Sequence, residues 1–560
     1  MRSFLPSVGA GHGRRRSGTA ALLALVVAAG LAACSDTATK PAASSTVNLD
    51  AKVVSVADGT LRGASADGYR SFLGVPYAAP PVGALRWKPP AAAAKWSGQR
   101  DATKAGAACP QLPSRIAGGD SGRGSDTEDC LFLNVYTPTT GTARRTLTEA
   151  AAKGKLPVMV WIHGGSYLNG AGADYGPARL VTESGVIVVT INYRLGALGF
   201  MNLPQLESES SLGSGVYGLL DQQAALRWVQ KNIGEFGGDA KNVTLFGESA
   251  GAGSVCSQVV SPQAKGLFAK AIAESGCALR GPSEATSAQT GIALAAKLGC
   301  QGGTIVACMR SKSATAIRDA QNASGTTLSW APTYGGAVLP ATVESALASG
   351  SYHTVPLLQG TNHDEGRLFA LSLGLSNLGP DLYSYAVNRA APTAATKILA
   401  QYPLSKYNNK PGDALGAIIT DSTFSCPALR VDQLASKRTS VYAYEFNDPD
   451  APLPKLADYP LKATHAAELP YLFDLKSLGG LPSPAQKLSQ EMIAYWTNFA
   501  INGDPNANGA TPWAKFSGAS GTMQALVPSG SKEFASGSFA TDHHCPFWNT
   551  LPNLTLRAAR

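Results

Sequence analysis

The segment from Gly247 to Gly251, Gly-Glu-Ser-Ala-Gly, constrains the fold of this chain more than any other. It directly follows the apolar run Val243–Phe246, which indicates a buried strand, and it stands where a helix is expected to begin. In a strand-to-helix turn this sharp, a serine takes a strained backbone conformation and its hydroxyl points out above the sheet. Glycines flank the serine because side chains two residues away would collide across the turn. The pattern therefore predicts an α/β fold that presents Ser249 as a nucleophile.

Composition limits the class of protein further. With 560 residues and 44% hydrophobic residues, the chain is long enough for a large core and too apolar for wholesale disorder. The net charge of +9 includes arginines of an N-terminal leader, among them Arg14–Arg16. After the leader, no basic run is interleaved with aromatic residues, so we expect no nucleic-acid partner.

The N-terminal leader has the parts of an export signal. Arg14–Arg16 form a positive region, and the apolar stretch Ala20–Ala29 is too short to span a membrane as a lasting anchor. Leu31–Cys34, Leu-Ala-Ala-Cys, resembles the bacterial lipobox, which is cleaved before its cysteine. We therefore expect a lipoprotein signal peptide over residues 1–33 and lipidation of Cys34.

The same leader predicts an exported protein. A lipid on Cys34 would anchor the chain to the cell membrane, and the polar residues 34–48 would form a flexible tether. An ordinary signal peptide cleaved nearby is the alternative, and it would release a secreted protein. The arginines leave the export route open, because a twin-arginine signal is also compatible with them.

Beyond the tether, no internal repeat or low-complexity linker divides the chain. Continuously apolar, β-branched runs predict buried strands, and longer runs with a helical apolar face separate them. The predicted strands are 158–162, 186–191, 243–246 and 355–358, and the predicted helices include 219–233 and 486–501. Strands separated by helices imply a mostly parallel central sheet flanked by helices. We expect one large α/β domain over residues 49–560.

A serine nucleophile needs further groups. An imidazole must accept its proton, a carboxylate must orient that imidazole, and backbone N–H groups must face the oxyanion of the tetrahedral intermediate. The glycine-containing loop His163–Ser166 follows a predicted strand, where such N–H donors belong in a fold of this kind. The N–H groups of Gly165, Ser166 and Ala250 are the candidate oxyanion hole.

These motifs and several further blocks resemble one known family. The chain is similar to the type-B carboxylesterase/lipase family, the cholinesterase-like branch of the α/β-hydrolases, in an exported bacterial lipoprotein form. The resemblance spans nearly the whole exported part and implies the α/β-hydrolase fold. The matching blocks are Phe72–Trp87, Glu128–Tyr136, Asn192–Gly196, Tyr217–Gln222, Phe246–Gly251, Gly360–Gly366 and Cys545–Asn549.

The resemblance selects the acid and the base. Glu365 occupies the position of the family's triad acid, although chemistry alone leaves its neighbour Asp364 an equal candidate. Among seven histidines, His465 matches the family's histidine block. The chain order Ser249, Glu365, His465 is the order typical of this fold.

The cysteine count fits an exported protein. Once Cys34 is set aside, eight of the nine cysteines remain, and an even number can pair completely in disulfides. The resemblance implies the disulfides Cys109–Cys130, Cys300–Cys308 and Cys426–Cys545. Cys256 and Cys277 are left as either a fourth bridge or two buried thiols. No C-x-x-C or H-E-x-x-H motif occurs, so the sequence predicts no metal site.

The resemblance also implies two ion pairs and an activity. Arg86 with Glu128, and Arg194 with Asp221, are expected to form buried ion pairs. The implied activity is that of a serine carboxylesterase which hydrolyses small-molecule esters through an acyl-enzyme and needs no cofactor.

The sequence leaves open several alternatives to a serine carboxylesterase. The same triad serves lipases and acyltransferases, and a non-catalytic adhesion or binding protein is a further reading of the family. A lipase would need an apolar lid, but the segment Ser114–Asp126 is polar and rich in glycine. We therefore expect short or medium acyl chains. The sequence does not predict the oligomeric state.

Overall fold

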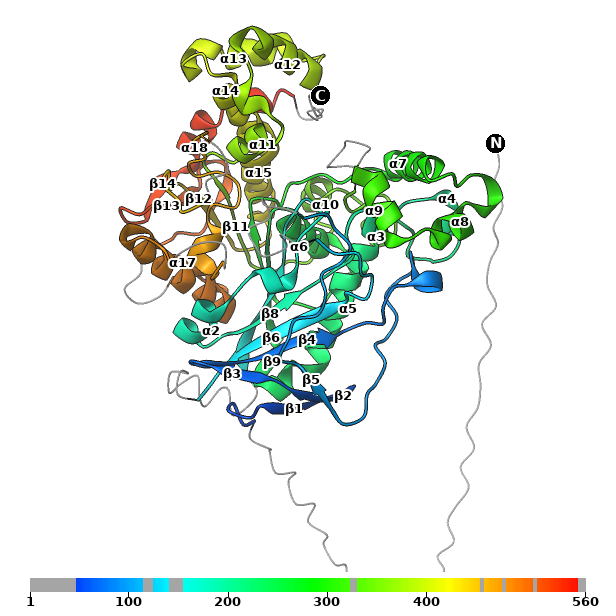
Figure 1. The fold of residues 1–560 in the computed structure, drawn as a ribbon. Helices are drawn as coiled ribbons and strands as arrows, with labels where there is room; N and C mark the ends of the chain where they lie inside the picture. Colours follow the sequence, from blue (N-terminus) through cyan, green and yellow to red (C-terminus); the bar gives the residue numbers. More distant parts are fainter. Residues whose placement is uncertain are drawn as a thin grey trace, which may run out of the picture. The chain divides into compact units, whose positions relative to one another are not determined.

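An eleven-stranded sheet forms the centre of the described structure, in the order β14-β13-β12-β11-β10-β9-β7-β8-β6-β4-β3 (Figure 1). The strands from β8 through β13 pair in parallel, while β3, β4 and β6 at one edge and β14 at the other are antiparallel. A small second sheet has the order β1-β2-β5. The predicted mostly parallel sheet is confirmed.

The computed structural model describes residues 47–113, 124–140, 155–322, 330–453, 458–475, 480–506 and 511–551. The predictions for residues 1–33, for Cys34 and for most of the tether 34–48 lie outside these ranges, as do residues 114–123 of the segment considered as a lid. Among the described residues, no single helix is long and apolar enough to cross a membrane. Two helical segments joined by a bend, Glu284–Lys297 and Gly302–Ser311, together have the length and composition of a membrane span.

The strand bounds show where the apolar runs end. Strand β9 begins before its apolar run and reaches Glu248, so that it delivers Ser249 at its carboxyl end. The strands are β1 Val53–Val56, β2 Gly59–Arg62, β3 Ala64–Ala66, β4 Tyr69–Pro76, β5 Gln99–Asp101, β6 Phe132–Pro138, β7 Leu156–Ile162, β8 Ile187–Ile191, β9 Gly238–Glu248, β10 Lys270–Glu274, β11 Leu357–Asn362, β12 Val441–Phe446, β13 Thr522–Leu526 and β14 Lys532–Ala535.

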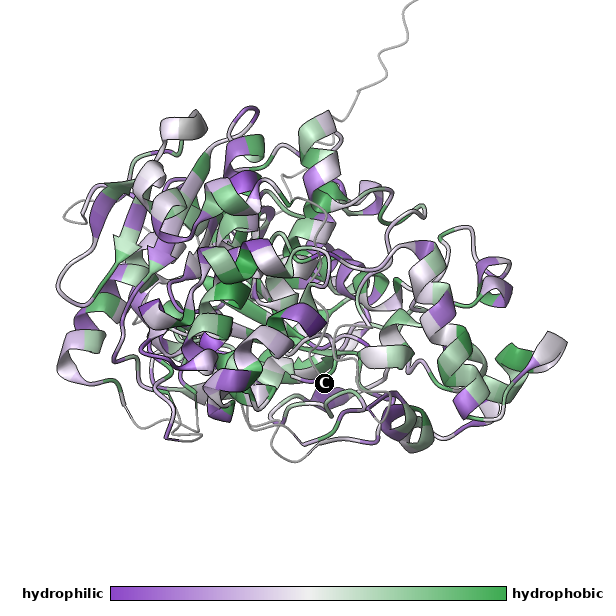
Figure 2. Cartoon of the chain, turned by 90° about the horizontal axis from the view of Figure 1, so that it is seen from above, coloured by the Kyte–Doolittle hydropathy of each residue, from purple (hydrophilic) through white to green (hydrophobic). Residues whose placement is uncertain are grey.

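Both faces of the sheet are buried, which explains why its central strands are apolar without alternation. Along β7, Val158, Val160 and Ile162 enter one hydrophobic core, whereas Met159 and Trp161 enter another on the opposite face. Figure 2 shows hydrophobic residues concentrated in the inner elements and mixed with hydrophilic ones on the outer helices.

Helices cover the two faces. The predicted helices are present as α5 and α17: α5 packs with α6 on one face, and α17 packs with α2 on the other (Figure 1). The α-helices described are α2 Ala178–Ser184, α3 Gly196–Phe200, α4 Pro204–Glu207, α5 Tyr217–Asn232, α6 Ala250–Val260, α7 Glu284–Lys297, α8 Ile305–Ser311, α9 Ala314–Asn322, α10 Val343–Ser349, α11 Gly366–Ser372, α12 Tyr383–Ala390, α13 Ala395–Gln401, α14 Pro411–Ile419, α15 Cys426–Ala435, α16 Leu469–Leu472, α17 Ser483–Asn502, α18 Ser536–Asp542 and α19 Cys545–Trp548. A π-helix, η10 (Thr420–Ser425), joins α14 to α15.

Disulfides join four pairs of cysteines. The three pairs that the resemblance implied are bridged: Cys109–Cys130, Cys300–Cys308 and Cys426–Cys545. The pair that the sequence left open, Cys256 and Cys277, is bridged as well. This fourth bridge ties α6, the helix after Ser249, to the segment that follows β10.

Candidate active site

Ser249 lies in the turn between β9 and α6, with φ 56° and ψ −124°. This left-handed conformation is strained for a residue with a side chain. The turn is possible because glycines flank it: a Cβ on Gly251 would lie 2.0 Å from the carbonyl oxygen of Ile162, and one on Gly247 would lie 2.6 Å from the same atom. The expected strand-turn-helix geometry is therefore present.

The three residues selected for the triad meet in space. His465 Nε2 lies 2.7 Å from Ser249 Oγ, and His465 Nδ1 lies 2.6 Å from Glu365 Oε2. The other carboxylate oxygen of Glu365 accepts a hydrogen bond of 2.8 Å from the backbone N–H of Asn362. The alternative acid, Asp364, instead faces the ring of His363 at 3.2 Å.

Buried carboxylates surround the imidazole. Glu248 Oε1 lies 3.2 Å from His465 Nε2, and Glu468 is held behind the site by a hydrogen bond from Asn362. Burial works against a charged His465, but the charges of Glu248 and Glu365 outweigh it, so the pKa of His465 is raised. Burial also raises the pKa of Glu248. The charge state of the imidazole therefore depends on Glu248 as well as on the acid Glu365.

Two aromatic rings pack against His465. The ring centroids of Phe369 and Phe424 each lie 5.0 Å from that of the imidazole, and the two phenyl rings lie 5.5 Å apart, stacked. Phe424 is buried and belongs to η10, whereas Phe369 is half-buried on α11. The sequence analysis missed both residues and also the proximity of Glu248 to the base.

The glycine loop after β7 lies against the serine. A Cβ on Gly164 would lie 3.1 Å from that of Ser249, and Gly165 and Ser166 have φ 99° and 55°. Among the described residues, no hydrogen bond engages the N–H groups of Gly165 or Ser166. Ala250 is the first residue of α6, where an N–H has no acceptor within the helix. The candidate oxyanion donors thus come from two segments: the loop after β7, and the first turn of α6 directly after Ser249.

Other residues singled out from the sequence are accounted for outside the triad. His163 is fully buried, and burial lowers its pKa to about 4, so the ring is neutral and stacks on Tyr193. The two expected ion pairs are present: Arg86 with Glu128, and Arg194 with Asp221 at 2.7 Å. Within the described ranges, no three His, Cys, Asp or Glu side chains form a group that could hold a metal ion.

Comparisons with known proteins agree with this geometry. A model of the "Carboxylesterase family" matches residues 50–548. "Acylcarnitine hydrolase" of Mus musculus is 36% identical over 479 residues, which cover 80% of this chain and 81% of the relative. "Para-nitrobenzyl esterase" of Bacillus subtilis (strain 168) is 36% identical over 487 residues, covering 83% of this chain and 92% of the relative. The solved structure "PNB esterase" aligns with a TM-score of 0.74 at 31% identity, covering 88% of this chain and 99% of that one.

The sheet, its flanking helices and the serine turn define an α/β-hydrolase. The chain belongs to the carboxylesterase family, and it is a carboxylic ester hydrolase.

Proposed function

We propose that this protein is a serine carboxylesterase that forms an acyl-enzyme on Ser249. The observation that carries the proposal is the continuous hydrogen-bonded line from Ser249 Oγ through His465 to Glu365, with distances of 2.7 and 2.6 Å. In such a line the base is oriented by the acid and lies within reach of the proton it must accept.

The proposed reaction has two stages. Ser249 Oγ attacks the ester carbonyl carbon while His465 Nε2 takes its proton, and His465 then gives that proton to the departing alcohol. Water next attacks the carbonyl carbon of the acyl-enzyme and loses a proton to His465. The bond between that carbon and Ser249 Oγ then breaks, His465 returns the proton to Oγ, and the acid is released. Glu365 keeps the imidazole in one orientation and stabilises its charged form.

The tetrahedral intermediates carry an oxyanion. We assign its stabilisation to the N–H groups of Gly165, Ser166 and Ala250, each of which is worth about 3 kcal/mol when aimed at the developing charge. Ser166 brings a side chain into a loop where the family usually carries a third glycine. We therefore expect this side chain to narrow the acyl or the alcohol group that the site accepts.

Hydrolysis of p-nitrophenyl esters from acetate to palmitate tests the proposal. We expect activity on short and medium chains that falls toward palmitate. Activity that rises toward palmitate would instead define a lipase. Product analysis with alcohol acceptors present separates hydrolysis from acyl transfer, because a transferase would yield a new ester in place of the free acid.

We further propose that the protein is exported and lipid-anchored through Cys34. The four disulfides support an oxidising location, since such bonds persist outside the cytoplasm. Incorporation of labelled palmitate into the wild type, and its loss in Cys34→Ser, is the expected result. A labelled Cys34→Ser protein would contradict the assignment.

A further inference from the structure

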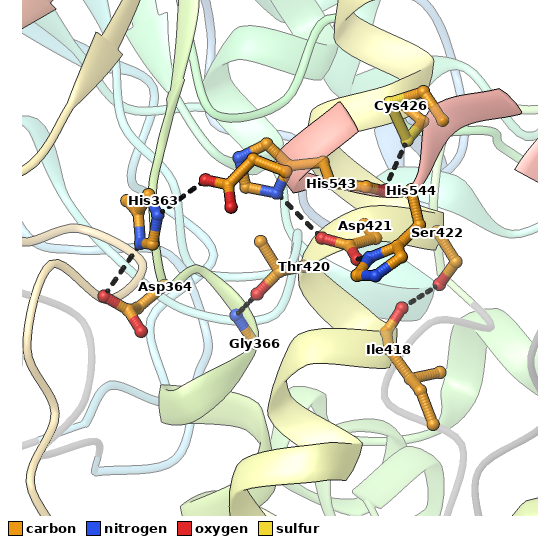
Figure 3. Close-up of polar contacts among 12 residues, drawn as sticks. His363, Asp364, Gly366, Ile418, Thr420, Asp421, Ser422, Cys426, His543 and His544 are labelled. Carbon is orange, nitrogen blue, oxygen red and sulfur yellow. Dashed lines mark hydrogen bonds and ion pairs between the residues drawn. A yellow bond between two sulfur atoms is a disulfide. The ribbon is translucent and has the colours of Figure 1, made fainter. Parts of the chain in front are cut away.

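The π-helix η10 (Thr420–Ser425) departs from the regular helices on either side of it. π-Helical turns are rare and occur often at functional sites. Two of its hydroxyls donate to carbonyl groups of the preceding turn. Thr420 Oγ1 lies 2.9 Å from the carbonyl oxygen of Gly416. Ser422 Oγ lies 2.6 Å from that of Ile418 (Figure 3). Such back-bonding is common for Ser and Thr within helices, so by itself it does not distinguish the two hydroxyls.

Thr420 links the π-helix to the acid of the site. Its Oγ1 accepts a hydrogen bond of 2.9 Å from the backbone N–H of Gly366, the residue after Glu365 (Figure 3). A Cβ on Gly366 would lie 2.0 Å from the carbonyl oxygen of Gly416, so α11 begins in direct contact with α14. The hydroxyl therefore fixes the chain at the point where it leaves the acid.

Phe424 links the same π-helix to the base. Its ring lies 5.0 Å from the imidazole of His465 and stacks on Phe369, so the two phenyl rings restrict the tilt of the imidazole. Residues four apart on a helix lie on neighbouring positions of one face, which explains why Thr420 and Phe424 both face the triad.

Asp421 anchors the π-helix from another direction. It accepts hydrogen bonds from His543 Nδ1 and from the hydroxyl of Tyr402, both at 2.7 Å, and lies 3.2 Å from His544 Nδ1. The second nitrogen of His543 lies 2.7 Å from Glu445 of β12. Figure 3 shows His543 and His544 converging on Asp421. The C-terminal helices and the sheet thus hold the π-helix in place.

We propose that the π-helix η10 is a positioning element for catalysis: Thr420 fixes the backbone that leaves Glu365, and Phe424 holds the ring of His465. The inference rests on the proposed esterase function, because it assigns the acid and the base as that function does. Thr420 and Phe424 act through Glu365 and His465 and do not react themselves.

The test compares two hydroxyls of the same π-helix. Thr420→Val and Ser422→Ala each remove a hydroxyl that bonds back to the preceding turn, but only Thr420 also holds Gly366. We expect Thr420→Val to lower kcat about tenfold or more with KM nearly unchanged, since small misplacements of catalytic groups cost this much. Thr420→Ser should restore kcat, and Ser422→Ala should match the wild type. Equal kcat in Thr420→Val and Ser422→Ala would overturn the proposal.

A second measurement does not depend on turnover. The proton between His465 Nδ1 and Glu365 gives a low-field NMR resonance that reports the geometry of this hydrogen bond. We expect it in the wild type and in Ser422→Ala, and we expect it broadened or shifted in Thr420→Val and Phe424→Leu. Thermal unfolding identifies any variant that has lost its fold. An unchanged resonance in folded Thr420→Val and Phe424→Leu would refute the positioning role, whereas an inactive wild type with the expected resonances would refute only the esterase function.

Discussion

The carboxylate of Glu248 lies 3.2 Å from the ring nitrogen of His465 that faces Ser249. Glu248 immediately precedes the serine in the chain, so the turn that exposes the nucleophile also brings a carboxylate to the base. Both residues are buried, and water screens their interaction little. The pair therefore determines the pH at which His465 loses its proton and becomes able to accept one from Ser249.

Glu248→Gln should move the pH dependence of the reaction. Removing the carboxylate lowers the pKa of His465, so the acid limb of kcat/KM is expected to shift to lower pH by about one unit. Glutamine keeps the size of the side chain, which isolates the effect of charge. The measurement is kcat/KM on p-nitrophenyl butyrate from pH 5 to pH 10. An acid limb that stays in place, or moves to higher pH, would contradict this electrostatic assignment.

The glycines of the serine turn should be intolerant of a side chain. In Gly251→Ala the new Cβ would lie 2.0 Å from the backbone oxygen of Ile162, and we expect a loss of about 3 kcal/mol in the free energy of unfolding. Gly537→Ala on α18 is the control, because no atom of the residues that the structure describes lies within 4 Å of its added Cβ. It should leave stability unchanged or raise it by up to about 1 kcal/mol. Equal stability of the two variants in urea would refute the steric argument.

His543 should make stability depend on pH. Burial opposes its charge, but the hydrogen bonds to Asp421 and Glu445 outweigh it and raise its pKa to about 9, above the ordinary value of 6.5. The contribution of the charged His543 to the free energy of unfolding is therefore complete below pH 6.5, and it is lost as the pH rises through 9. Further ionisable groups near it are His363, whose ring lies 5.5 Å away, His544, which shares Asp421 with it, and Asp542.

The change that tests this is His543→Gln. The wild type should exceed this variant in free energy of unfolding by about 3 kcal/mol more at pH 6 than at pH 10. His353→Gln serves as the control, because the ring of His353 contacts the carbonyl oxygen of Ser261 and, within the described part of the chain, no carboxylate. A wild-type advantage that stays constant with pH would show that His543 is not held as a charged group.

The disulfides should differ in their contributions to stability. Cys426–Cys545 spans 119 residues and Cys300–Cys308 spans 8. Because a longer closed loop restricts the unfolded chain more, replacing the first pair by alanine is expected to cost about 5 kcal/mol and the second about 2.5 kcal/mol. Urea unfolding of the two double variants measures the difference. A larger loss for the shorter loop would mean that native packing, and not loop entropy, determines the effect.

Much of the fold was predictable from local patterns. Continuous apolar runs located β7, β8 and the end of β9, because a strand buried on both faces needs no polar positions. The run predicted as 355–358 overlaps β11 only at Leu357 and Leu358, because the rest of that strand, Gln359–Asn362, is buried but not apolar. The same patterns placed α5 and α17 to within a few residues. Strand β9 is longer than predicted. Gly238 pairs with Leu156 of β7, and the residues 239–242 that follow lie in a register shift and are mostly polar, so no hydrophobic run marks them.

The candidate site was predictable only in part. The residue pattern left Asp364 and Glu365 equivalent, and it is the tertiary structure that turns Glu365 toward His465 and Asp364 toward His363. The π-helix was not predicted from the sequence, although its polar run Thr-Asp-Ser-Thr interrupts the apolar residues that end α14. Contacts between Phe424 and His465 join segments far apart in the sequence, so no local pattern reports them.

The most direct test of the account is the release of p-nitrophenol by the wild type and by Ser249→Ala, with Ser517→Ala as an exposed control. We predict a burst of about one p-nitrophenol per protein molecule in the wild type and the control, followed by steady turnover, as an accumulating acyl-enzyme requires. Ser249→Ala should show no burst and lose about 10³-fold or more in kcat. A folded wild type that releases nothing from any ester, or a Ser249→Ala protein that retains the burst, would contradict the assignment of Ser249 as the nucleophile.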